Sequence, residues 1–157
     1  MAYRGKYRPK NPSKYIGDPT NIIYRSLKER SIMSYFDLAP KVIRWNSEGV
    51  IIPYLYDVDG KVHRYFMDFY AEIKTIDGTV KRYLFEYKPK SKLSQPRPPK
   101  ANSRSKKRAA RFYAESCDYI KNKNKWAYTA EYAKKNGLLF FVVCEENVKG
   151  MNFFESL

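Results

Sequence analysis

Three charged residues have the types and spacing of a phosphodiester-cleaving site. Glu86 and Lys88 are two residues apart in the apolar-rich run 80–88, and Asp68 lies in the preceding run 62–73. Side chains alternate along a strand, so residues two apart point to the same face. An Asp-Gly dipeptide between the runs is a strong hairpin signal. We therefore expect the runs to pair antiparallel and to place Asp68 beside Glu86 and Lys88.

Two carboxylates beside an ammonium group suit metal-assisted hydrolysis of DNA. Carboxylate oxygens are the hard ligands that Mg²⁺ takes in proteins, and Mn²⁺ accepts the same donors. A metal held in this way polarises a phosphate and lowers the pKa of a bound water. Lys88 would orient that water or offset charge that grows on the phosphate. Without a cation the carboxylates would repel the substrate, so the pattern predicts a Mg²⁺ or Mn²⁺ site.

The Glu-x-Lys element alone is weak, because the chain contains other acidic-x-Lys triplets. One is Glu72-Ile73-Lys74, and another is Asp59-Gly60-Lys61. Without further support, Glu86 and Lys88 would be exposed strand charges whose pairing is worth only ~0.2–1 kcal/mol. The only histidine, His63, alternates to the face opposite Asp68, which favours a structural role. Arg64 falls on the Asp68 face of the same predicted strand and is the better phosphate contact.

The elements that must position these residues form one α/β pattern. The expected order is α-β-β-β-α-α-β, a mixed sheet flanked by helices. A continuous apolar final strand indicates burial on both faces and a parallel position after a helical crossover. The predicted elements are a helix at 20–37 capped by Thr20 or Asn21, strands at 42–45 and 50–56 that are one interrupted strand or two, strands at 62–73 and 80–88, a helix from Ser103 or Ser105 to about 121, a helix at 124–136 ended by Gly137, and a strand at 138–144.

The charge of the chain points to a polyanionic partner. There are 31 Lys and Arg residues against 16 Asp and Glu, and the net charge is +15. Residues 1–30 carry 8 basic and 2 acidic groups, and residues 88–111 carry 10 basic and no acidic groups. Nucleic acid is the simplest partner, with an acidic protein or an anionic membrane as alternatives.

This charge distribution predicts two basic appendages to a nearly neutral globular domain. Residues 1–19 form a basic N-terminal arm, and residues 89–104 form a basic, proline-rich loop within a domain spanning 20–157. Tyrosines of the arm either stack on bases or pack on the domain. The predicted contacts with double-stranded DNA are Arg4, Lys6, Arg8, Arg64, Lys100, Arg104, Lys106, Lys107 and Arg108.

The whole constellation resembles the PD-(D/E)XK nuclease superfamily. Met67-Asp68 corresponds to the Pro-Asp element of the motif, with the proline absent, and Glu86-Tyr87-Lys88 corresponds to (D/E)-x-K. A helical Glu before the sheet often completes such sites, and Glu29 stands in that position. The resemblance implies a restriction-endonuclease-like domain. Its implied catalytic set is Glu29, Asp68, Glu86 and Lys88, with the three carboxylates as metal ligands.

Several short stretches are similar to a narrower family, nucleases that act on tailed-phage heads at completion. They include Tyr3-Arg4-Gly5-Lys6-Tyr7, Asn11-Pro12-Ser13-Lys14-Tyr15, Gly17-Asp18-Pro19, His63-Arg64-Tyr65, Glu86-Tyr87-Lys88-Pro89 and Asn136-Gly137. This similarity implies endo- and exonuclease activity on packaged DNA, a role in joining heads to tails, and portal or neck proteins as partners. Two alternatives stay open: a junction resolvase or transposon-end endonuclease of the same fold, and a catalytically silent DNA-binding virion protein.

The remaining features favour the host cell cytoplasm during assembly, with retention in the virion as a second option. Cys117 and Cys144 lack metal-ligand spacing, which favours free thiols in a reducing compartment. No apolar region of a signal peptide follows the basic N-terminus. No stretch approaches the ~20 apolar residues of a membrane span, so we expect no membrane partner.

Overall fold

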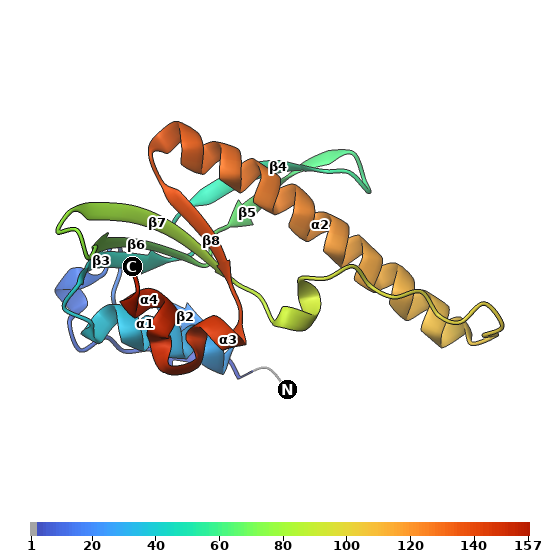
Figure 1. Cartoon of the computed structure of the whole chain (residues 1–157), viewed down its shortest axis with the longest axis horizontal. Helices are drawn as coiled ribbons and strands as arrows, with labels where there is room; N and C mark the ends of the chain where they lie inside the picture. The colour runs from blue at the N-terminus through green and yellow to red at the C-terminus, as the bar shows by residue number, and fades with distance from the viewer. Residues whose placement is uncertain (1–2) are drawn as a thin grey trace.

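A four-stranded mixed sheet runs through the centre of the computed structural model, which describes residues 3–157 (Figure 1). Its strand order is β3-β6-β7-β8; β6 is antiparallel to β3 and β7, whereas β8 is parallel to β7. Two antiparallel ribbons, β1–β2 and β4–β5, accompany it. The strands are Gly5–Tyr7 (β1), Ile22–Tyr24 (β2), Val42–Ser47 (β3), Ile51–Tyr56 (β4), Lys61–Phe66 (β5), Phe69–Lys74 (β6), Val80–Tyr87 (β7) and Leu139–Val143 (β8).

Helices cover both faces of this sheet, as Figure 1 shows. One hydrophobic core joins α1 and the C-terminal helices to the sheet, with Phe36, Trp45 and Phe154 at its centre. The other core joins α2 and the β4–β5 ribbon to the opposite face through Tyr65, Leu84 and neighbouring residues. The helices are Leu27–Leu38 (α1), Lys106–Asn136 (α2), Glu145–Val148 (α3) and Asn152–Glu155 (α4), with 3-10 turns at Pro12–Lys14 (η1), Lys90–Lys92 (η2) and Lys149–Met151 (η3).

Several predicted elements are confirmed, and with them the α/β class. The β6–β7 hairpin forms as expected, and β8 pairs parallel to β7 after the crossover through α2. Gly137 ends α2 in the left-handed conformation, with φ 66°, and Ser105 caps its start by accepting from the Arg108 amide. Between residues 3 and 157 no helix is long and apolar enough to cross a membrane.

The predicted helix at 20–37 is wrong in its first part. Residues Ile22–Tyr24 pair with the N-terminal strand as β2, because the run Ile-Ile-Tyr favours extended backbone. The helix begins at Leu27, and its cap is Ser26, whose side chain accepts from the Glu29 amide at 3.1 Å. This later start moves Glu29 from mid-helix to the first turn.

The two predicted helices between 103 and 136 are one helix of 31 residues. The expected break lay near Asn122 and Asn124, whose helix propensity is low. Tertiary contacts override that propensity: Asn122 is buried, and the Asn124 side chain exchanges hydrogen bonds with Asp57 at 2.9 and 3.0 Å. The first half of α2 therefore projects from the body together with the loop 89–104 (Figure 1).

Burial on both faces was predicted for the last strand, and the structure corrects this. β8 is an edge strand, and Leu139 is 43% exposed. After β8 the chain forms α3, η3 and α4, which the sequence analysis did not predict. Phe154 of α4 is fully buried against Phe36 and Phe85, so this C-terminal segment completes the core.

The N-terminal segment packs on the domain. Tyr7 and Tyr15 both lie edge-on to the Trp45 ring, at centroid distances of 6.2 and 4.8 Å. Asp37, fully buried at the end of α1, accepts hydrogen bonds from the Tyr7 hydroxyl and from the Lys10 and Asn11 amides. For these two tyrosines, packing on the domain is therefore the observed alternative.

Candidate active site

A break in the sheet positions Asp68. The predicted long strand at 62–73 is two strands, because the chain leaves the β4–β5 ribbon after Phe66 and enters the central sheet at Phe69. The alternation of side chains changes at this break: Tyr65 faces α2 from β5, whereas Tyr70 does so from β6. Asp68 was expected to share a face with Phe66, but it does not. It continues the register of β6, in which Phe69 lies opposite Phe85.

Glu86 and Lys88 meet Asp68 at this point, as the sequence predicts. The Asp68 Oδ2 atom accepts a hydrogen bond from the Tyr87 amide at 2.9 Å, which ties it to the end of β7. Glu86 is only 2% exposed and lies 3.4 Å from the Lys88 Nζ atom. The Lys88 amide donates to the Val143 carbonyl of β8, which fixes the backbone from which its side chain leaves.

Glu29 reaches the same site from the first turn of α1. The Arg25 amide donates to its Oε2 atom at 2.9 Å, so the carboxylate is held at the helix N-terminus. Glu86 and Glu48 both act on Glu29 electrostatically. The predicted set of Glu29, Asp68, Glu86 and Lys88 is thus brought together from three separate segments.

Burial and repulsion between the carboxylates favour the binding of a cation at this site. Burial first, and the neighbouring Glu86 second, raise the pKa of Asp68 well above its ordinary value. Burial is also the main cause that raises the pKa of Glu29. Holding all three carboxylates ionised together therefore requires compensating positive charge beyond that of Lys88.

The carboxylates suit a divalent ion by their chemistry. In the structure, Glu86 accepts a hydrogen bond from the buried Tyr65 hydroxyl, and Asp68 is turned to the Tyr87 amide. Across residues 3–157, no group of three or more His, Cys, Asp or Glu side chains stands in a ready ion-binding arrangement. Asp68, Glu86 and Glu29 nonetheless offer hard oxygen donors, with unneutralised negative charge, at one place. The residues present fit Mg²⁺ or Mn²⁺ in kind.

Lys125 on α2 is a site residue that sequence reasoning missed. Its Nζ atom lies 4.9 Å from the centroid of the Tyr65 ring, and the charges of Lys88, Glu86 and Asp68 act on the Lys125 ammonium electrostatically. Burial, followed by repulsion from Lys88, lowers the pKa of Lys125. No spacing rule could have identified it, because about 40 residues separate it from Glu86 in the chain.

Glu48 and Arg25 form a second missed pair at the edge of the site. The Arg25 guanidinium binds the Glu48 carboxylate at 2.8 and 3.3 Å. Glu48 has positive φ, 57°, and its amide donates to the carbonyls of Met67 and Asp68. It therefore braces the chain break that carries Asp68.

Three other predicted assignments fall outside this cluster. Arg64 alternates with Tyr65 along β5, so its side chain lies on the outer face of the ribbon, 5.6 Å from the Phe66 ring. This placement corrects the expectation that Arg64 shares the Asp68 face. His63 pairs with Asp59 at 2.7 Å and stacks on Tyr54, in agreement with a structural role. Glu72, the competing acidic residue, pairs with Arg44 at 2.9 Å.

The predicted DNA contacts lie at the surface. Lys6 is an exposed residue of β1, and the exposed Arg4 and Arg8 lie on either side of this strand. Lys14, in contrast, donates hydrogen bonds to the carbonyls of Asp37 and Ala39 at the end of α1. The others are exposed along the projecting loop and the start of α2. They are Lys100, Arg104, Lys106, Lys107 and Arg108.

Comparison with known proteins places this chain in a family of nucleases. The model of the TnsA-like endonuclease N-terminal family matches residues 39–145, which include Asp68, Glu86, Lys88 and Lys125 but not Glu29. The chain is 36% identical over 154 residues to the head completion nuclease of Enterobacteria phage T4, and the match covers 98% of each chain. No solved structure matches. The chain therefore belongs to the TnsA-like endonuclease family and to the group of head completion nucleases that the phage T4 protein represents.

Proposed function

We propose that this protein is a divalent-metal-dependent deoxyribonuclease that acts on packaged DNA when phage heads are completed. The observation that carries this proposal is the half-buried Asp68 beside the buried Glu86 and Lys88, in a chain that matches a head completion nuclease over almost its full length. The TnsA-like endonuclease family model supports cleavage within a strand.

Each member of the site has a distinct task in this proposal. Asp68 and Glu86 hold the ion, and Glu29 completes the ligand set from α1. When bound, the ion supplies Lewis-acid polarisation of the phosphate and a more acidic water. Lys88, whose ammonium is 3.4 Å from Glu86, stabilises charge that develops on the scissile phosphate. Lys125, on α2, adds a second cation that stabilises the charge developing on the scissile phosphate.

Metal dependence is the first test. Plasmid and linear duplex DNA are expected to be cut with Mg²⁺ or Mn²⁺ and to stay intact in excess EDTA. Ca²⁺ is expected to support DNA binding with little turnover, because its looser coordination positions water poorly. Gel analysis of both substrates measures the result. Full cleavage in EDTA would remove the proposed ligand roles of Asp68, Glu86 and Glu29.

The grip on DNA is assigned to the projecting basic segment. Replacing Lys100, Arg104, Lys106, Lys107 and Arg108 together with Gln is expected to weaken duplex binding without changing base preference. Each lost phosphate contact should reduce the slope of log K against log salt by ~0.9. A matched variant that loses five body lysines, at positions 61, 74, 81, 134 and 135, should keep most of the slope. Equal slopes in the two variants would assign the projection to a protein partner.

The biological part of the proposal follows from the relative. A nuclease confined to the last stage of assembly would trim DNA that protrudes at the portal, so that neck proteins can dock. Portal or neck proteins are then its partners, and the host cytoplasm is where it acts, with retention in the virion as the alternative. Location would choose the cut, which agrees with the absence of a base-reading motif from the sequence.

A further inference from the structure

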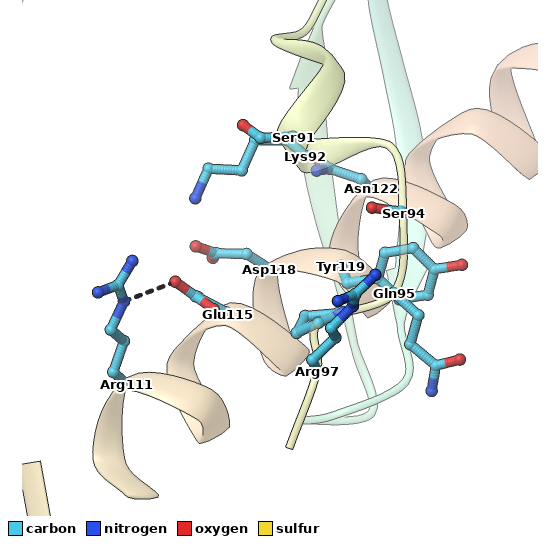
Figure 2. Close-up of a pocket in the computed structure, with 11 residues that line it drawn as sticks. Ser91, Lys92, Ser94, Gln95, Arg97, Arg111, Glu115, Asp118, Tyr119 and Asn122 are labelled. Atoms are coloured by element: carbon cyan, nitrogen blue, oxygen red, sulfur yellow. Dashed lines mark hydrogen bonds and ion pairs between the residues drawn. The ribbon is translucent and has the colours of Figure 1, made fainter. Parts of the chain in front are cut away.

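A cavity of about 480 Å³ lies between residues 91–97 and helix α2, outside the catalytic cluster (Figure 2). Its volume falls in the about 300–1,000 Å³ range of small-molecule sites. The loop contributes Ser91, Lys92, Ser94, Gln95, Pro96 and Arg97, and the helix contributes Arg111, Glu115, Asp118, Tyr119 and Asn122. Nearly every lining side chain is polar, so the cavity suits a polar ligand.

Asn122 and Asp118 supply complementary polar groups to this lining. Asn122 is only 8% exposed, and its side-chain amide lines the cavity. Asp118 is exposed and has no ion-pair partner among residues 3–157, whereas Arg111 is bound to Glu115 at 2.9 Å (Figure 2). A ligand that presents both donors and acceptors can therefore bind the Asn122 amide and the Asp118 carboxylate together.

The remaining chemistry specifies what that ligand is. Tyr119 supplies an aromatic ring, which can stack on a base. Amide side chains pair with the edges of bases, and a carboxylate accepts from an exocyclic amine. Lys92 and Arg97 supply positive charge for a phosphate. A ring, base-edge partners and cations within one cavity are the requirements of a nucleotide.

Two residues that line the cavity lie a few residues along the chain from members of the catalytic cluster. Asn122 lies one helical turn before Lys125, at the spacing that places side chains next to each other on a helix. Lys92 follows Lys88 by four residues, through the short turn η2. A nucleotide in the cavity is therefore close to the phosphate that Lys88 and Lys125 face.

We propose that this cavity binds an unpaired nucleotide of the DNA strand next to the scissile phosphate. This inference rests on the proposed nuclease function and names its substrate class: duplex DNA with a frayed or overhanging strand at the cut. A base inside a duplex is stacked and its pairing edge is engaged, so it cannot present that edge to Asn122 and Asp118.

The test compares two duplexes of the same sequence, one blunt and one with a short overhang carrying a fluorescent base analogue. Binding is measured by anisotropy in EDTA, with the full-length protein, after a gel confirms intact DNA. Tyr119→Ala should weaken overhang binding about 5- to 100-fold and change blunt binding by less than about twofold. Tyr119→Phe should restore overhang binding, because it keeps the ring. Tyr113→Ala is the matched control: this tyrosine is 67% exposed on the same helix and outside the cavity.

Three results would overturn the inference. One is equal weakening of both duplexes by Tyr119→Ala, and another is no weakening of either. The third is displacement by free mononucleotides with overhang binding unchanged in the variant, which would mark a mononucleotide site. Cleavage of the blunt duplex by the wild-type protein with Mg²⁺ is measured separately. If no cleavage occurred, the proposed nuclease function would be contradicted, whereas the inference about the cavity would still be decided by the binding data.

Discussion

Cleavage of DNA by an Asp68→Asn variant is expected to fall by at least about 10²–10³-fold, while duplex binding is retained. The substitution keeps the shape of the side chain, and the amide oxygen can still accept from the Tyr87 amide. It removes the negative charge through which Asp68 would hold the ion. Single-turnover cleavage with Mg²⁺ and binding in Ca²⁺ separate the two effects.

The control for this variant is Glu72→Gln, on β6, the strand that begins one residue after Asp68. Glu72 belongs to a similar acidic-x-Lys triplet, but it pairs with Arg44 and is not part of the site. Glu72→Gln should therefore leave cleavage close to that of wild type. If Glu72→Gln abolished cleavage and Asp68→Asn did not, the catalytic carboxylate of this segment would be misassigned.

The Asp68→Asn substitution also separates an enzymatic role of the protein in the phage from a structural one. A phage that encodes Asp68→Asn is expected to make filled heads and separate tails that fail to join. Adding the wild-type protein to an extract of those parts should restore infectious particles. Normal assembly of the mutant phage would instead make catalysis dispensable and favour the silent DNA-binding alternative.

Asp37→Asn is expected to lower the free energy of unfolding by about 2–4 kcal/mol. The fully buried carboxylate accepts from the Tyr7 hydroxyl at 2.8 Å and from the Lys10 and Asn11 amides at 2.7 and 2.9 Å. An amide offers one acceptor oxygen in place of two and turns an NH₂ group toward these donors. Chemical denaturation followed by circular dichroism measures the loss.

Tyr7→Phe provides the graded comparison. It removes one of the three donors and leaves the ring against Trp45, so it should cost about 1 kcal/mol. An Asp37→Asn protein as stable as wild type would mean that the N-terminal segment contributes little to the fold. In that case the three hydrogen bonds would offset only the cost of burying the carboxylate.

Local spacing predicted the centre of the site, and distant packing supplied its edges. Asp68, Glu86 and Lys88 follow from alternation and a hairpin dipeptide, both of which act over a few residues. Lys125 depends on how α2 docks across the sheet, and Glu48 depends on a positive φ beside the chain break. Neither leaves a periodic trace in the sequence.

The same division explains the errors in the fold. A break in α2 was predicted between residues 121 and 124, but the burial of Asn122 and the hydrogen bonds between Asn124 and Asp57 keep the helix continuous. Alternation predicted one strand at 62–73, because apolar residues keep the same period on both sides of Asp68. Burial does alternate without interruption there, but the two halves are buried against different cores.

The family assignments also bear on the rival functions. A transposon-end endonuclease was one alternative, and the TnsA-like family model matches residues 39–145 of this chain as an endonuclease. The phage T4 relative, which matches 98% of the chain, supports the narrower role in head completion. Both matches span Asp68, Glu86 and Lys88, so we expect a change of substrate within the family to come from the surfaces around these residues.

The continuity of α2 gives the molecule a fixed measure. Lys125 faces the catalytic carboxylates, and Lys106 begins the helix at its far end. At 1.5 Å per residue these positions are about 28 Å apart along the axis, which is the length of about eight base pairs of duplex. For DNA that lies along the helix, the length of the uninterrupted helix would fix the distance between the cut and the farthest bound phosphate. A glycine inserted at mid-helix would make the helix more flexible, and this distance would then vary.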